Sequence, residues 1–300
     1  MVAITLAIFL AIWSLVHADY SDTHSKKTKH PKTQSTELKK YRGYKGLYMG
    51  HSFFKPSAMA LSKIIPETKV MGHEQTVVFN GGKKGSPKEL WRNNHKRKAG
   101  QKALDSGEID LLVMTYFSVE NSSAEHYGKW FDYAIEKNPR IVFVVTIPWA
   151  TQLYKADLKA IRKSVPIKAM VLYKSLILKL REMYPQNKVL YCPYGYGTYE
   201  LMYLLNEDKL PGVKYVLNPK IETRRKSAQL NEQLLNDPLG HPGELVSMLG
   251  ALLWLQTIYD YDLSELKPIR VQGLPRVDLN AIASEVNNEI NPFNAVYKEK

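Results

Sequence analysis

The sequence predicts an α/β fold, a three-layer α/β/α sandwich with a central parallel sheet. Short apolar runs alternate with helical patterns between residues 45 and 259. The apolar runs are continuous, as in strands that are buried on both faces of a sheet. Alternation of strands and helices implies right-handed crossovers between parallel strands. A chain of 300 residues with 44% hydrophobic composition suits one substantial domain or two small ones.

Each expected strand leads into an expected helix. Strands are predicted at the apolar stretch that begins at Lys45 and ends at Gly50, and at residues 75–80, 109–117, 140–149 and 188–195. Helices are predicted at residues 56–65, 86–104, 124–136, 155–183 with an interruption at Pro166, 198–205 and 245–259. Ligands of such sheets bind at the carboxyl ends of the strands, so residues that follow a strand are the first candidates for a site.

The composition divides the chain into four segments. Residues 1–18 are almost wholly apolar and end in Val-His-Ala, which predicts a secretory signal peptide cleaved after Ala18. An uncleaved membrane anchor is the alternative, but the apolar run is short for a span. Residues 19–44 are rich in lysine and predict a flexible basic lead-in. Residues 45–265 form the expected globular domain, and residues 266–300, with three prolines, are expected as an extended wrap packed on it or trailing from it.

The net charge of +13 favours anionic partners. Acidic or sulfated polysaccharides and lipid headgroups fit an exported protein, extracellular or periplasmic, whereas nucleic acid does not. After cleavage of residues 1–18 no stretch is long enough to span a membrane, so no integral span is expected. A solvated basic surface without a specific ligand is the alternative.

The single cysteine excludes an internal disulfide and a zinc site of the usual spacing. Cys192 lies in an apolar strand, which predicts a buried thiol. Neither a metal nor an organic cofactor is expected.

Ser52 is placed as a nucleophile would be. Gly50-His51-Ser52 ends a predicted strand, and a helix begins a few residues later. Glycine permits a sharp turn, and the N-terminus of a helix offers unpaired N–H groups to a developing oxyanion. A turn with a capping serine is the alternative reading.

A second block, Asp237-Pro-Leu-Gly-His241, precedes the last predicted helix. With Ser52 at the end of the first strand, this order of motifs resembles the SGNH (GDSL-type) hydrolase family over roughly residues 45–259. The resemblance implies a flavodoxin-like fold, Ser52 as nucleophile, His241 as base and Asp237 as its orienting acid. Two departures stand out: His51 replaces the family's Asp, and D-x-x-x-H is one residue longer than D-x-x-H.

The resemblance also implies an oxyanion hole. Gly85, after the second strand, matches the glycine that donates a backbone N–H together with that of Ser52. The family's asparagine after the third strand has no clear equivalent: Ser118 falls there by count, and Asn121 lies three residues further on. Asn121 also begins a glycosylation sequon, which predicts an exposed loop.

His51, Trp149, Tyr194 and Tyr196 are the candidate pocket residues, since each lies at a strand end. The sequence therefore predicts a secreted serine esterase that acts on a carbohydrate or lipid ester. The alternative is an inactive SGNH-type fold that binds acidic glycan or matrix components, which the departures and the positive charge favour.

Overall fold

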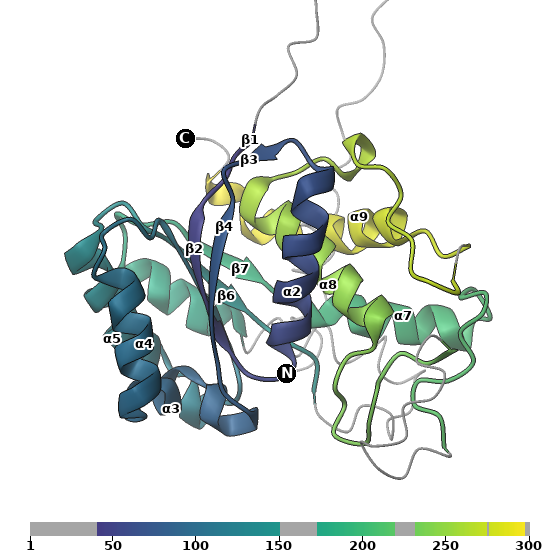
Figure 1. The fold of residues 1–300 in the computed structure, drawn as a ribbon, viewed down its shortest axis with the longest axis horizontal. Coiled ribbons are helices and arrows are strands. Elements are labelled where there is room, and N and C mark those ends of the chain that lie inside the picture. Colours follow the sequence, from purple (N-terminus) through teal and green to yellow (C-terminus); the bar gives the residue numbers. More distant parts are fainter. Residues whose placement is uncertain (1–40, 151–172, 220–231, 275, 298–300) are drawn as a thin grey trace, which may run out of the picture. The chain divides into compact units, whose positions relative to one another are not determined.

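Five parallel strands form the central sheet of the computed structural model, which describes residues 41–150, 173–219, 232–274 and 276–297. The strands are β2 (Lys45–Gly50), β4 (Glu74–Phe79), β5 (Leu111–Thr115), β6 (Val142–Thr146) and β7 (Val189–Cys192). Their order across the sheet is β4-β2-β5-β6-β7, and every neighbouring pair is parallel (Figure 1). The predicted α/β fold with a central parallel sheet is confirmed.

The strand order places a topological switch point at β2. The chain leaves β2 to form β4 on one side, then returns to form β5 on the other side. Connections that leave the sheet in opposite directions create a crevice at the carboxyl ends of β2 and β5. Ligands of open α/β sheets bind in such a crevice. Gly50, the last residue of β2, marks that position.

Side chains that alternate along the strands supply two separate cores. Leu47 and Met49 face one side of the sheet, and Tyr48 faces the other. The Leu47 side is covered by α3 (Pro87–Arg92), α4 (Asn94–Leu104), α5 (Ala124–Lys137) and a helical stretch at 173–183. The Tyr48 side is covered by α2 (Phe54–Ile64), α7 (Gly195–Asn206), α8 (Glu244–Tyr259) and α9 (Leu279–Ile290) (Figure 1).

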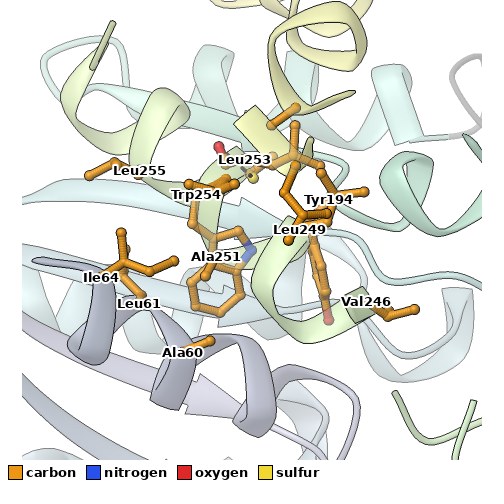
Figure 2. Packing of buried hydrophobic residues seen from close by; sticks show 14 of the residues in the cluster. Ala60, Leu61, Ile64, Tyr194, Val246, Leu249, Ala251, Leu253, Trp254 and Leu255 are labelled. Atoms are coloured by element: carbon orange, nitrogen blue, oxygen red, sulfur yellow. Dashed lines mark hydrogen bonds between the residues drawn. The ribbon is translucent and has the colours of Figure 1, made fainter. Parts of the chain in front are cut away.

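Helix α8 is the centre of the second core. Thirteen of its 16 residues are buried, which explains why its sequence shows no polar face. The Trp254 ring lies toward α2, near Ala60 and Leu61 (Figure 2), and stacks on Tyr48 at 6.0 Å between centroids. Because α2 begins two residues after Ser52 and α8 begins three residues after His241, the packing of α2 on α8 fixes the two segments relative to one another.

The structure corrects the predicted helix at residues 86–104. Two helices occupy this range, because Asn93 leaves the helical conformation with φ −76° and ψ 106°. The Asn93 Oδ1 atom accepts a hydrogen bond from the N–H of Lys96 at 3.0 Å and so caps α4. Ser86 caps α3 in the same way, with Pro87 at the first helical position.

The two ends of the domain also differ from expectation. Tyr41–Arg42 (β1), assigned to the flexible lead-in, pair with Val70–Met71 (β3) as a short parallel ladder. The segment after residue 266 is not simply an extended wrap, because α9 packs on α8 through Leu279, Ala283 and Val286. The remaining short elements are 3-10 helices: η1 (Ile65–Glu67), η2 (Gly82–Gly85), η3 (Val119–Asn121), η6 (Leu263–Glu265), η7 (Asn291–Phe293) and η8 (Ala295–Tyr297).

Three sequence predictions fall wholly or partly outside the described residues: the signal peptide at 1–18, the lead-in over residues 19–40 and the part of the 155–183 helix around Pro166. Within the described ranges, no helix has both the length and the apolar character that crossing a bilayer requires.

Candidate active site

Ser52 lies in the turn between β2 and α2. The N–H groups of Phe54 and Lys55 both donate to the carbonyl of His51 at 3.2 Å, which closes this turn directly after the strand. The Ser52 side chain is neither buried nor fully exposed. It therefore stands at the carboxyl edge of the sheet, at the switch point.

The loop that carries His241 is built around a buried carboxylate. Asp237 is 1% exposed, and its Oδ1 atom accepts the N–H of Leu239 at 3.1 Å and that of His241 at 3.2 Å. The Gly240 N–H donates to the Asp237 carbonyl at 2.9 Å, and Gly240 has φ +90°, a conformation that favours glycine. The additional residue of D-x-x-x-H is thus accommodated in a turn that keeps Asp237 and His241 together.

Ser52, His241 and Asp237 form a continuous hydrogen-bonded chain. His241 Nδ1 lies 2.7 Å from Asp237 Oδ2, and His241 Nε2 lies 2.7 Å from Ser52 Oγ. A carboxylate only accepts, so Nδ1 carries the imidazole proton and Nε2 accepts from the serine hydroxyl. A base that is oriented by a carboxylate and bonded to a hydroxyl is the arrangement that activates a serine.

Gly85 lies against the backbone that leads to Ser52. A Cβ atom at residue 85 would lie 2.5 Å from the Gly50 carbonyl oxygen and 2.6 Å from His51 Cα. These neighbours are backbone atoms that cannot move aside, so only glycine fits. The loop after β4 therefore lies directly against the Gly50–His51 backbone, next to the serine turn.

The loop after β5 brings Ser118 and Asn121 together. Asn121 Nδ2 donates to Ser118 Oγ at 2.8 Å, so the serine hydroxyl keeps its own proton available for donation. The neighbouring Phe117 ring contacts the His51 ring edge-on at 5.5 Å, which brings this loop to the serine turn. Val119 and Glu120 are exposed, as expected of a surface loop, but Asn121 itself is 3% exposed, so the asparagine of the sequon is buried.

His51 joins two loops of the site. Its Nδ1 accepts the N–H of Phe53 at 3.3 Å, and its Nε2 lies 3.0 Å from the Tyr116 carbonyl oxygen. Since Nδ1 accepts, the proton is on Nε2 and donates to Tyr116. Burial lowers the pKa of His51 from 6.5 to about 4, although the bond to Tyr116 opposes the shift and the nearby His241 adds to it. His51 is therefore neutral at pH 7.

The low pKa of His51 predicts a pH-dependent stability. Between pH 6.5 and about 4 the unfolded chain binds a proton at His51 that the folded chain does not, so stability falls as pH decreases through this window. The loss is on the order of 3 kcal/mol. Denaturant unfolding of wild type and His51→Gln at pH 7.5 and pH 4.5 measures it. We expect a smaller pH effect in the variant, and equal effects would contradict this assignment.

The four candidate pocket residues do not line an open pocket in the described part of the chain. His51, Trp149 and Tyr194 are at most 3% exposed, and Tyr196 is 9% exposed. Tyr194 packs edge-on against Trp254 at 5.4 Å, inside the core. Large aromatic rings at strand ends gain free energy from burial beneath the loops, and a pocket role for these four residues stays a prediction.

Sequence reasoning missed Phe53. Its ring lies edge-on against the His241 imidazole at 5.4 Å and stacks on Trp149 at 5.0 Å with an interplanar angle of 9°. An aromatic residue directly after the candidate serine was the available signal.

Cys192 is buried, as predicted, and burial raises its pKa to about 12. A thiol in this state is not a nucleophile at neutral pH. Among the described residues, no group of three or more histidine, cysteine or acidic side chains is arranged to hold a metal ion.

Comparison with known proteins supports the fold. No protein-family model and no curated protein matches the chain. A solved structure of a DUF4886 family protein from Bacteroides uniformis has a TM-score of 0.54 and 14% identity, over 84% of this chain and 95% of that chain. This similarity shows a shared fold alone. The periplasmic domain of a lipopolysaccharide acetyltransferase from Salmonella ser. Paratyphi A has a TM-score of 0.34 and 15% identity, over 73% and 83% of the two chains, which is too low to support an argument.

Proposed function

We propose that this protein is an SGNH-type serine hydrolase that cleaves esters through an acyl-enzyme. The observation that supports this proposal is the chain from Ser52 Oγ to His241 Nε2 and from His241 Nδ1 to Asp237 Oδ2, with 2.7 Å at each link. The Ser52–His241 link lies within the range over which a general base takes a proton, and the His241–Asp237 link orients the imidazole for this transfer.

In the proposed reaction, Ser52 Oγ attacks the ester carbonyl carbon and its proton passes to His241 Nε2. The carbonyl oxygen becomes an oxyanion, which the N–H groups of Ser52 and Gly85 stabilise, with the Ser118 hydroxyl as third donor. The C–O bond then breaks, and the leaving alcohol takes the proton from His241. Water attacks the acyl-Ser52 ester by the same route, releases the acid and restores the enzyme.

His51 has a structural role in this proposal. The family's Asp at this position could not donate to the Tyr116 carbonyl, whereas the neutral His51 Nε2–H does so. The departure at residue 51 therefore leaves the loops after β2 and β5 joined. It does not weigh against activity.

The net positive charge of the chain is the basis for proposing which class of molecule carries the ester. A net charge of +13 favours an ester carried on an acidic polysaccharide or an anionic lipid. Export from the cell, expected from residues 1–18, belongs to the same proposal.

A fluorophosphonate probe tests the proposal. An activated serine displaces fluoride from phosphorus and retains the phosphonyl group, and we expect that mass on the peptide containing Ser52 after proteolysis. Ser62, an exposed serine of α2 whose hydroxyl donates to the Met59 carbonyl, is the internal control and stays unmodified. Folded protein that the probe does not modify, but that binds heparin-like polymers in a salt-sensitive manner, would favour the glycan-binding alternative.

A further inference from the structure

Trp149 contacts the loop that carries His241. Its indole Nε1–H donates to the carbonyl of Gly240 at 2.9 Å, across 91 residues of sequence. Gly240 is the residue directly before His241, and it is buried. A buried carbonyl without a partner is costly, so this bond selects the loop conformation in which Gly240 faces Trp149.

The Trp149 ring also reaches His241 through a second side chain. Phe53 lies flat on the indole at 5.0 Å between centroids, and its ring meets the His241 imidazole edge-on at 5.4 Å. One tryptophan thus acts on the backbone just before His241 and, through Phe53, on the imidazole ring itself. Phe53 directly follows Ser52 in sequence, so the same contacts join both partners of the Ser52–His241 hydrogen bond.

Trp149 is itself held on a rigid base. It follows β6, and the Gly195 N–H donates to the Ile147 carbonyl at 2.9 Å. A Cβ atom at residue 195 would lie 2.4 Å from the Trp149 nitrogen, so the start of α7 is in direct contact with the Trp149 backbone. The N–H of the next residue, Ala150, donates to the Tyr199 hydroxyl at 3.2 Å. Because these contacts restrain Trp149 relative to the sheet, its hydrogen bond to Gly240 also restrains the loop that carries His241.

We propose that Trp149 is a positioning residue that holds His241 in line with Ser52 and Asp237. This inference rests on the proposed function of these three residues. The additional residue in Asp237-Pro-Leu-Gly-His241 makes the loop longer, and the indole bond to Gly240 restrains the peptide unit at that position. In this role Trp149 does not contact the substrate. Its 2% exposure agrees with a buried side chain that supports the loop carrying His241.

Trp149→Phe removes the indole N–H and keeps an aromatic ring beside Phe53. The matched control is Tyr184→Phe, which removes a hydroxyl that donates to Asp132 Oδ1 at 2.7 Å and lies 3.3 Å from the Gly128 carbonyl oxygen, on the opposite face of the sheet. Because Trp149→Phe also reduces volume, a second variant carries 3-benzothienylalanine at residue 149, in which sulfur replaces the N–H at nearly unchanged shape.

The first measurement does not depend on activity. The proton of a histidine Nδ1–H that donates to a buried carboxylate resonates far downfield of the amide protons, and its absence in His241→Ala assigns it. We expect this resonance to broaden or disappear in both Trp149 variants and to stay in Tyr184→Phe. The second measurement is hydrolysis of a short p-nitrophenyl ester, for which we expect kcat to fall by about 10- to 100-fold while KM changes by less than about twofold.

The outcomes separate this inference from the proposed function. Wild-type protein without esterase activity, in which the Trp149 variants nevertheless lose the downfield resonance, would contradict the proposed function and support the positioning role. An unchanged resonance together with an unchanged kcat in the Trp149 variants would overturn the positioning role. An equal loss of the resonance in Tyr184→Phe would also overturn it, because the effect would then reflect general destabilisation.

Discussion

Ser52→Ala is expected to reduce the hydrolysis of short p-nitrophenyl esters by about 10⁵-fold or more. The variant lacks the hydroxyl that lies 2.7 Å from His241 Nε2, so no acyl-enzyme can form. Any residual rate would come from water that attacks with the help of the oxyanion donors and the bound geometry alone. Initial rates of purified wild type and variant, measured at equal concentration over several pH values, give the ratio.

The fold of this variant should be unchanged. The turn around residue 52 is closed by backbone bonds to the His51 carbonyl, and alanine keeps these bonds. Circular dichroism and the midpoint of denaturant unfolding check this expectation. Ser62→Ala, in helix α2 that follows this turn, is the matched control: it also removes a serine hydroxyl, one that donates to the Met59 carbonyl, and it should retain the wild-type rate. Equal rates for Ser52→Ala and wild type would remove the esterase proposal.

Strands β2, β5, β6 and β7 could be predicted from sequence because they are buried on both faces, whereas β4, at the edge of the sheet, is mostly exposed or half-buried. Within the predicted strand at 140–149, residues 141–145 are apolar without interruption, and β6 occupies Val142–Thr146. The ends of the strands were overestimated, since residues such as Ile147 and Trp149 are equally apolar but pack as loops beyond the last ladder bond.

The missed elements depend on contacts that a local pattern does not contain. Asn93 interrupts a range of good helix formers because its side chain caps the next helix. A continuous helix and a capped break are both compatible with the local sequence, so the sequence alone does not decide between them. Helix α9 was missed because the surrounding prolines dominated the interpretation. Buried Asn280 explains its position: its side chain bonds to the backbone of Leu266 and Ile269, which ties the preceding segment to the helix.

In the candidate site, too, some features could be predicted from the sequence and the long-range contacts could not. The proximity of Ser52 and His241 could be expected from the resemblance to the SGNH family, in which the serine follows the first strand and the histidine precedes the last helix. The contacts that hold them could not, because Trp149 meets Gly240 across 91 residues and no local pattern marks an indole as a donor to a distant carbonyl. The burial of the four candidate pocket residues likewise depends on long-range packing that a local pattern does not contain. The catalytic roles of Ser52, His241 and Asp237 stay predictions.

Asp237→Asn is expected to lower kcat by about 10³- to 10⁴-fold while the protein stays folded. The Oδ1 atom of Asp237 accepts the N–H groups of Leu239 and His241, and the amide oxygen of asparagine can take over both bonds. The amide NH₂ then replaces Oδ2 beside His241 Nδ1. Because NH₂ donates, Nδ1 must accept, and the imidazole proton moves to Nε2.

In that tautomer Nε2 cannot accept the Ser52 proton, so catalysis fails although every heavy atom is nearly in place. The distinguishing observation is a large loss of kcat with an almost unchanged unfolding midpoint and unchanged KM. Asp237→Ala is the comparison variant: it also removes the acceptor of the two N–H groups, so we expect it to lower the unfolding midpoint as well. If Asp237→Asn kept the wild-type rate, His241 would not depend on Asp237 for its tautomer, and the longer D-x-x-x-H loop would support a Ser52–His241 dyad in place of a triad.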